Sequence, residues 1–211
     1  MTTVLIIAKE PVPGRVKTRL TPPYTPQEAA ALAEAALADT LRAALAAPVR
    51  RVRLVLEGRP GPWLPAGVEV VPQCPGGLDE RLAAAFAGCS GPAVLIGMDT
   101  PQVTAGLLAP ALGPNAWQDC DAWFGPAVDG GFWALGLARP EPELLRGVPM
   151  STPETGREQR ARLLARGLTV RDLPVLRDVD TARDAALVAR EAPPGGRFAA
   201  LVDRLTPAGA R

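Results

Sequence analysis

The 211-residue chain balances 23 Lys and Arg residues against 22 Asp and Glu residues, which leaves a net charge of +1, and 47% of its residues are hydrophobic. This balance provides no global field for nucleic acid or an acidic membrane, so any anion must be bound locally. The sequence has no histidine, which excludes Ser-His-Asp triads, Cys-His dyads and His-ligated zinc. Carboxylates, lysines, arginines and an oxygen-bound metal remain as the available chemistry.

The length predicts a single α/β domain over residues 1–211. The cysteines are odd in number and lack CxxC spacing, which indicates free thiols in a reducing compartment: Cys74, Cys89 and Cys120. No apolar run is long enough to span a bilayer, and the N-terminal residues lack the shape of a signal peptide. We therefore expect a cytoplasmic protein with no membrane span and no nucleic-acid partner; its oligomeric state stays open.

Residues 3–8 form a continuous apolar run, the pattern of a buried parallel strand. A long helix is expected after the loop that follows, because Thr25 can cap it, Pro26 suits its first position and Glu28 completes a capping box. Further strands are expected at 51–56, 68–71, 93–97, 121–125, 132–137 and 168–174, and further helices at 78–88, 105–112, 153–167, 182–191 and 196–205. This alternation predicts a three-layer α/β/α sandwich with a mostly parallel central sheet.

The loop after the first strand is strongly basic. It carries four cations and a glycine that lets the backbone turn: Lys9, Arg15, Lys17, Arg19 and Gly14. Parallel sheets bind ligands at the carboxyl ends of their strands, and cationic side chains bind phosphate. The loop therefore favours the phosphates of a nucleotide, although a solvated basic loop is the simpler alternative.

Acidic residues lie at two further strand ends or loops. Asp99 follows the 93–97 strand directly, which suits a ligand of Mg²⁺ or Mn²⁺, although it could instead cap the next helix. Asp178 and Asp180 stand two apart and share one face of an extended chain, so both could address one cation. Capping of the helix near 182 by Asp180 or Thr181 is the stronger local explanation for one of these two acids. The other acid is left free.

Asp129 is followed by Gly130 and Gly131, which allow a close approach to a ligand or a positive φ. A plain Asp-Gly hairpin turn explains the same residues equally well. Ser151 and Thr152 offer hydroxyls at the start of a helix, where an acceptor could bind, although capping is the simpler account. Arg81, at the start of the 78–88 helix, either lies near the nucleotide or faces solvent.

Six segments, in this order, resemble the selenodomain-associated transferase family, which is GT-A-like and belongs to the nucleotide-diphospho-sugar transferase superfamily: AKEPVPGRVKTRL, QCPGGLDERL, IGMDTP, GPAVDGGFWALGL, STPETG and LPVLRDVDT. The resemblance covers residues 4–184 and implies a GT-A, Rossmann-like fold. Two departures stand out: Asp79 replaces an expected glycine, and Phe132 stands where tyrosine is common.

The resemblance implies a metal-dependent transferase that uses Mg²⁺ or Mn²⁺ and a nucleotide-activated donor. The resemblance maps the donor phosphates onto Lys9, Arg15, Lys17 and Arg19, the metal-binding acid onto Asp99, and two further motifs onto Asp129–Gly131 and Asp178–Asp180. Our own hypothesis adds Asp178 or Asp180 as the second metal ligand, Asp129 and Lys17 as catalytic residues and Arg81 as a nucleotide-binding candidate. It places the acceptor near Gly130, Gly131, Ser151 and Thr152.

Three functions stay open. The first is transfer of a sugar from a nucleotide-diphospho-sugar to a small acceptor. The second is nucleotidyl transfer from an NTP with release of pyrophosphate, because the first loop also resembles phospholactate guanylyltransferases. The third is nucleotide binding without catalysis. No motif identifies the base, the sugar or the acceptor.

Overall fold

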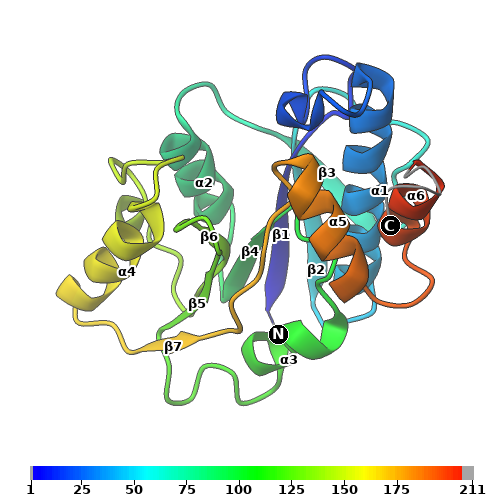
Figure 1. The fold of residues 1–211 in the computed structure, drawn as a ribbon. Coiled ribbons are helices and arrows are strands. Elements are labelled where there is room, and N and C mark those ends of the chain that lie inside the picture. Colours follow the sequence, from blue (N-terminus) through cyan, green and yellow to red (C-terminus); the bar gives the residue numbers. More distant parts are fainter. Residues whose placement is uncertain (1, 206–211) are drawn as a thin grey trace.

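The computed structural model describes residues 2–205. Within them the chain forms one seven-stranded sheet in the order β3-β2-β1-β4-β6-β5-β7 (Figure 1). The strands are β1 (Thr3–Lys9), β2 (Arg51–Glu57), β3 (Val68–Pro72), β4 (Ala93–Gly97), β5 (Ala122–Pro126), β6 (Phe132–Leu137) and β7 (Val170–Asp172). The helices are α1 (Pro26–Leu45), α2 (Leu78–Ala87), α3 (Ala105–Leu112), α4 (Thr155–Ala165), α5 (Ala182–Glu191) and α6 (Arg197–Leu205), with 3-10 turns η1 (Thr18–Leu20) and η2 (Pro142–Leu144).

Helices cover both faces of the sheet, as the alternating pattern predicts. Neighbouring side chains of a strand point to opposite faces, so Ile6 packs into the core beneath α1 and α3, while Leu5 packs into the core beneath α2 and α4. Helices α5 and α6 pack on the outer side of α1 rather than on the sheet (Figure 1). The expected three-layer α/β/α arrangement is confirmed, with α5 and α6 added outside one layer.

The sheet is mostly parallel, with one reversed strand. β6 runs antiparallel to both of its neighbours, β4 and β5. The reason is the short connection at 127–131, because a few residues can close a hairpin but cannot provide a parallel crossover. The hairpin interpretation of the Asp-Gly sequence is thus correct.

The sheet order positions the basic loop and Asp99 together. β1 and β4 are adjacent and parallel, with Ile6 opposite Ile96 in their register. Their carboxyl ends therefore reach the same edge of the sheet, so the loop after β1 and the turn after β4 emerge side by side.

Most observed limits of helices and strands lie within two residues of the limits predicted from the sequence. The helix expected over 153–167 is shorter, because it begins at Thr155 and ends at Ala165. Gly167 lies just beyond that end with φ of +80°, the left-handed conformation that follows many helices. All three cysteines are free, as expected. No helix within residues 2–205 has the length and hydrophobicity needed to cross a membrane.

A buried carboxylate joins α6 to α1. Asp39 on α1 is 6% exposed and accepts hydrogen bonds from the backbone N–H groups of Arg197 and Phe198, at 3.0 and 2.8 Å. It also forms an ion pair with Arg42 at 3.1 Å. Asp39 therefore satisfies N–H groups at the start of α6 that have no partner within the helix.

Replacing this carboxylate should loosen α6. We expect Asp39→Ala to lower the free energy of unfolding by about 2–3 kcal/mol, because two buried N–H groups lose their acceptor. Urea denaturation measures the change. Glu34→Ala, at an exposed position of the same helix, should change stability by less than about 0.5 kcal/mol. Equal effects of the two substitutions would contradict this role for Asp39.

Candidate functional site

Asp99 lies at the carboxyl end of β4 and is free to take part in a site. The residue that caps α3 is Thr104, whose hydroxyl accepts a hydrogen bond from Leu107 N at 3.1 Å. The alternative that Asp99 caps the following helix is therefore wrong. Its carboxylate instead contacts the ammonium group of Lys17.

Neither Asp178 nor Asp180 caps α5. Thr181 does so in a capping box with Asp184, in which each side chain accepts a hydrogen bond from the other residue's backbone N–H. Of the two expected caps, Thr181 is confirmed and Asp180 is wrong, because Thr181 and Asp184 already satisfy the helix start. Both acids are thus left for the site.

The segment that carries these two acids is tied directly to the end of β4. Val179 N donates to the carbonyl of Asp99 at 3.0 Å. The buried side chain of Gln102 donates to the carbonyl of Arg177 at 2.5 Å. Gln102 carries no motif, so no sequence signal indicates its positioning role.

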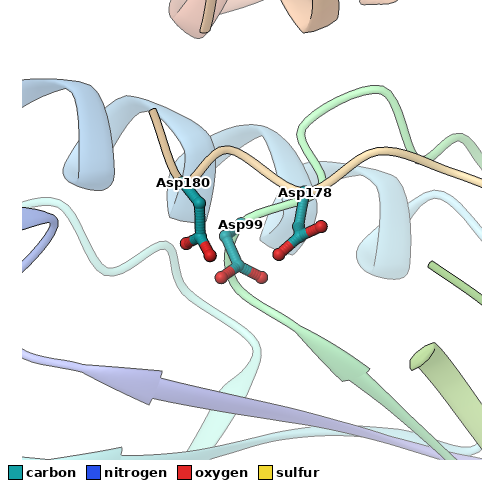
Figure 2. A group of neighbouring side chains, drawn as sticks. All are labelled: Asp99, Asp178 and Asp180. Carbon is teal, nitrogen blue, oxygen red and sulfur yellow. The ribbon is translucent and has the colours of Figure 1, made fainter. Parts of the chain in front are cut away.

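The result is a cluster of three carboxylates. Oxygens of Asp99, Asp178 and Asp180 all lie within 4.8 Å of one another. Figure 2 shows their carboxyl groups side by side, with Asp99 between the other two, directed into the same space. Clustered carboxylate oxygens are the ligands that Mg²⁺ and Mn²⁺ prefer, so the residues present fit such an ion.

Lys17 reaches this cluster from the basic loop. Its Nζ lies 2.8 Å from Asp99 Oδ2 and 3.1 Å from Asp180 Oδ1, and its side chain is only 12% exposed. Burial alone lowers the pKa of Lys17, but the two carboxylates outweigh it and raise that pKa above its ordinary value. Arg19 adds a looser, exposed ion pair with Asp180 at 3.4 Å. A positive charge therefore already occupies part of the acidic cluster.

Asp178 is the acid that these cations do not neutralise. It has no ion pair among the described residues. Burial raises its pKa to about 6, and the nearby charges of Asp99, Asp129 and Asp180 add to this effect. The cluster thus keeps an unsatisfied negative charge, which a bound cation would neutralise.

The other predicted phosphate-binding cations diverge from the cluster. Lys9 and Arg81 both form ion pairs with Glu57, at 3.6 and 2.5 Å. Arg81 also donates to Gln73 Oε1 at 3.2 Å, so it is held at the end of β2. Arg15 is exposed. The structure therefore brings only Lys17 and Arg19, of the predicted cations, onto the acids.

The Asp-Gly-Gly turn packs against the segment before α4. Gly130 has φ of +91°, and a Cβ there would lie 2.1 Å from the carbonyl oxygen of Pro153. Gly156 N donates to the carbonyl of Gly130 at 2.8 Å. Asp129 Oδ1 accepts from Gly131 N at 2.8 Å. Chain packing thus accounts for the glycine at 130, and the turn lies beside the residues predicted to hold an acceptor.

Ser151 and Thr152 belong to the turn that precedes α4. Ser151 has φ of +59°, and Thr152 Oγ1 accepts from Glu154 N at 3.3 Å. Glu154 occupies the N-cap position, so capping in the strict sense does not explain these two hydroxyl residues.

The chain belongs to the family described as "Uncharacterized protein conserved in bacteria (DUF2064)", whose profile matches residues 25–152. No curated protein matches its sequence.

Solved structures share its fold. A protein of Desulfovibrio desulfuricans G20, named as a candidate nucleotide-diphospho-sugar transferase, is 25% identical, with a TM-score of 0.83 over 96% of this chain and 97% of that one. Rv0371c of Mycobacterium tuberculosis H37Rv, solved as a manganese complex, is 22% identical, with a TM-score of 0.54 over 89% and 96%. The 2-C-methyl-D-erythritol 4-phosphate cytidylyltransferase of Thermus thermophilus is 18% identical, with a TM-score of 0.51 over 88% and 96%.

The raised pKa of Asp178 has a measurable consequence for stability. The folded protein binds a proton at Asp178 up to about pH 6, whereas an unfolded aspartate releases it near pH 4. Stability is therefore lost as the pH rises from about 4 to 6, and the loss persists above that range.

Asp178→Asn removes this ionisation. In the absence of divalent ions we expect it to stabilise the fold by about 1–2 kcal/mol at pH 7.5, after allowing for solvent screening of a half-buried group, and by less at pH 4.5. Urea denaturation at both pH values measures the difference. Asp203→Asn, at an exposed position of α6, serves as the control. A stabilisation that is equal at the two pH values would contradict the assigned pKa.

Proposed function

We propose that this protein is a metal-dependent transferase that uses a nucleotide-activated donor, most directly a glycosyltransferase acting on a small acceptor. One observation carries the proposal: three carboxylates and a buried ammonium group meet where β1 and β4 end. This combination suits a divalent ion together with the phosphates of a nucleotide. The proposal treats residues 1–211 as one catalytic domain, and the narrower assignment to selenodomain-associated transferases is part of it.

Each residue of the site has a proposed task. Asp99, Asp178 and Asp180 would hold Mg²⁺ or Mn²⁺, which supplies positive charge that stabilises the leaving phosphate. Lys17, together with Arg19, would bind and neutralise the donor phosphates, because these two cations of the first loop lie at the acids. Manganese in the Rv0371c structure supports this choice of ions by analogy of fold alone.

Asp129 would orient the acceptor and receive its proton. Its Oδ1 accepts the Gly131 N–H, so Oδ2 is the oxygen left for the acceptor hydroxyl. In glycosyl transfer the acceptor oxygen bonds to the anomeric carbon, and the carbon–oxygen bond to the diphosphate breaks. The bonding electrons leave with the nucleoside diphosphate, and the proton passes to Asp129.

Nucleotidyl transfer is the second candidate. The cytidylyltransferase of similar fold supports it, as does the guanylyltransferase-like first loop. Here an oxygen of the acceptor bonds to the α-phosphorus of an NTP, the α–β anhydride bond breaks, and pyrophosphate leaves. The same cations and acids would bind the phosphates and the metal in both reactions. The two reactions are therefore distinguished by their products and not by their site residues.

Product analysis separates the candidates. Panels of UDP- and GDP-sugars and of the four NTPs are incubated with Mn²⁺ and simple hydroxyl or phosphate acceptors. Release of UDP or GDP supports glycosyl transfer, and release of pyrophosphate supports the second candidate. Metal-dependent nucleotide binding by calorimetry without either product would indicate a non-catalytic nucleotide-binding protein and contradict both.

The central acid should be essential in either reaction. We expect Asp99→Asn to lower turnover at least about a hundredfold, because a metal ligand is lost and the buried Lys17 ammonium loses its closest partner. Steady-state kinetics with the active donor measures the change. Asp203→Asn is the matched control and should retain full turnover. Near-normal turnover of Asp99→Asn would refute the assigned site.

A further inference from the structure

Lysine is rare in this chain, and its placement is informative. Lys9 and Lys17 are the only lysines among 23 basic residues; the others are arginines. An ammonium group is a compact point charge on a flexible stem, whereas a guanidinium is a planar fork. The chain thus carries its more compact cation where a small ion would bind.

Lys17 and a divalent ion would need the same carboxylates. Nζ of Lys17 already contacts one oxygen of Asp99 and one of Asp180, and both carboxylates belong to the cluster that fits the ion. An ion held by these groups would lie within a few ångströms of the ammonium. Two cations at that separation repel each other strongly in a partly buried site. The ion and the ammonium therefore compete for the acids.

We propose that Lys17 is an exchangeable internal cation, which holds Asp99 and Asp180 in the metal-free protein and moves to the donor phosphates when a divalent ion binds. This inference rests on the proposed function and adds to it a coupling between metal binding and phosphate binding. The ion releases the ammonium, and the phosphates give the released ammonium a new partner. Metal and polyphosphate then bind with positive cooperativity, each favouring the other.

The loop allows this movement. Gly14 and Arg15, the residues of the loop just before Lys17 that form no ion pair with the acids, are both exposed to solvent. The long side chain of Lys17 can turn away from the acids by rotation about its own bonds. Arg15, two residues away along the chain, adds a second exposed cation to the same loop. Two neighbouring cations attract a polyanion and repel each other without one.

The charges explain why the exchange depends on both ligands. With Lys17 in place, Asp178 is the acid of the cluster that forms no ion pair within residues 2–205, so its carboxylate is available to a cation. An ion that binds alone must displace a buried ammonium from two carboxylates, which weakens its affinity. Once phosphates accept the ammonium, that cost falls.

Lysine labelling of the wild-type protein tests the exchange. N-acetoxysuccinimide acetylates free amines, and peptide mass spectrometry compares Lys17 with Lys9, whose side chain is 58% exposed and serves as the internal reference. We expect saturating Mg²⁺ alone to raise the relative rate at Lys17 at least about fivefold. Added inorganic pyrophosphate should lower that rate again. An unchanged rate at saturating Mg²⁺ would overturn the proposal, as would a Lys17 that stays reactive with pyrophosphate.

Metal affinity provides an independent test. Electron paramagnetic resonance of free Mn²⁺ measures binding without any phosphate. We expect Lys17→Met to bind Mn²⁺ about tenfold more tightly than the wild type, because the competing ammonium is gone. Arg183→Met removes an exposed charge at the start of α5 without touching the acids and should change affinity less than twofold. Equal or weaker binding by Lys17→Met would overturn the exchange.

The results separate this inference from the proposed function. If Lys17→Met fails to fold, labelling of the wild type still decides the outcome. Release of Lys17 by the ion without turnover of any donor would support the exchange and contradict the proposed transfer. Metal-dependent turnover of a donor, with a labelling rate at Lys17 that does not respond to the bound ion, would support the proposed transfer and contradict the exchange.

Discussion

The site depends on three carboxylates being held together against their mutual repulsion. Like charges a few ångströms apart repel by a few kcal/mol even with an effective dielectric constant near 20. Two features offset this cost: the hydrogen bond from Val179 N to the Asp99 carbonyl, and the ammonium of Lys17. Neither feature neutralises Asp178, and burial together with the remaining repulsion raises its pKa to about 6. The unpaired negative charge of Asp178 makes this site attractive to a cation.

The sheet supplies the geometry that makes this cluster possible. Lys17, Asp99 and Asp180 are separated by about eighty residues at each step, yet they contact one another because β1 and β4 are neighbours. The bridge between Ala127 and Leu176 brings the turn that holds Asp129 beside the same acidic segment. Packing of α5 and α6 on α1 anchors the chain just beyond that segment. The site is therefore built from distant segments and not from a single motif.

The sequence predicted the fold well and correctly placed Asp99 at the end of a strand, because both depend on local patterns of apolar strands and capped helices. The role of Asp99 as a metal ligand stays a proposal. The sequence could not decide between Asp180 and Thr181 as the cap of α5, since both residues fit the local rule. It could not foresee that Gly130 faces Pro153, or that Arg81 pairs with Glu57, because these contacts join segments far apart in the chain. The sequence could not decide the role of a residue where that role depends on a partner far away in the chain.

An anomalous difference map from crystals soaked with Mn²⁺ and a nucleoside diphosphate tests the metal site and the movement of Lys17 together. We expect a manganese peak among Asp99, Asp178 and Asp180, with the Lys17 ammonium on a phosphate oxygen. A map with no peak at these carboxylates would contradict the metal site. A peak there with Lys17 still bound to Asp99 and Asp180 would contradict the exchange.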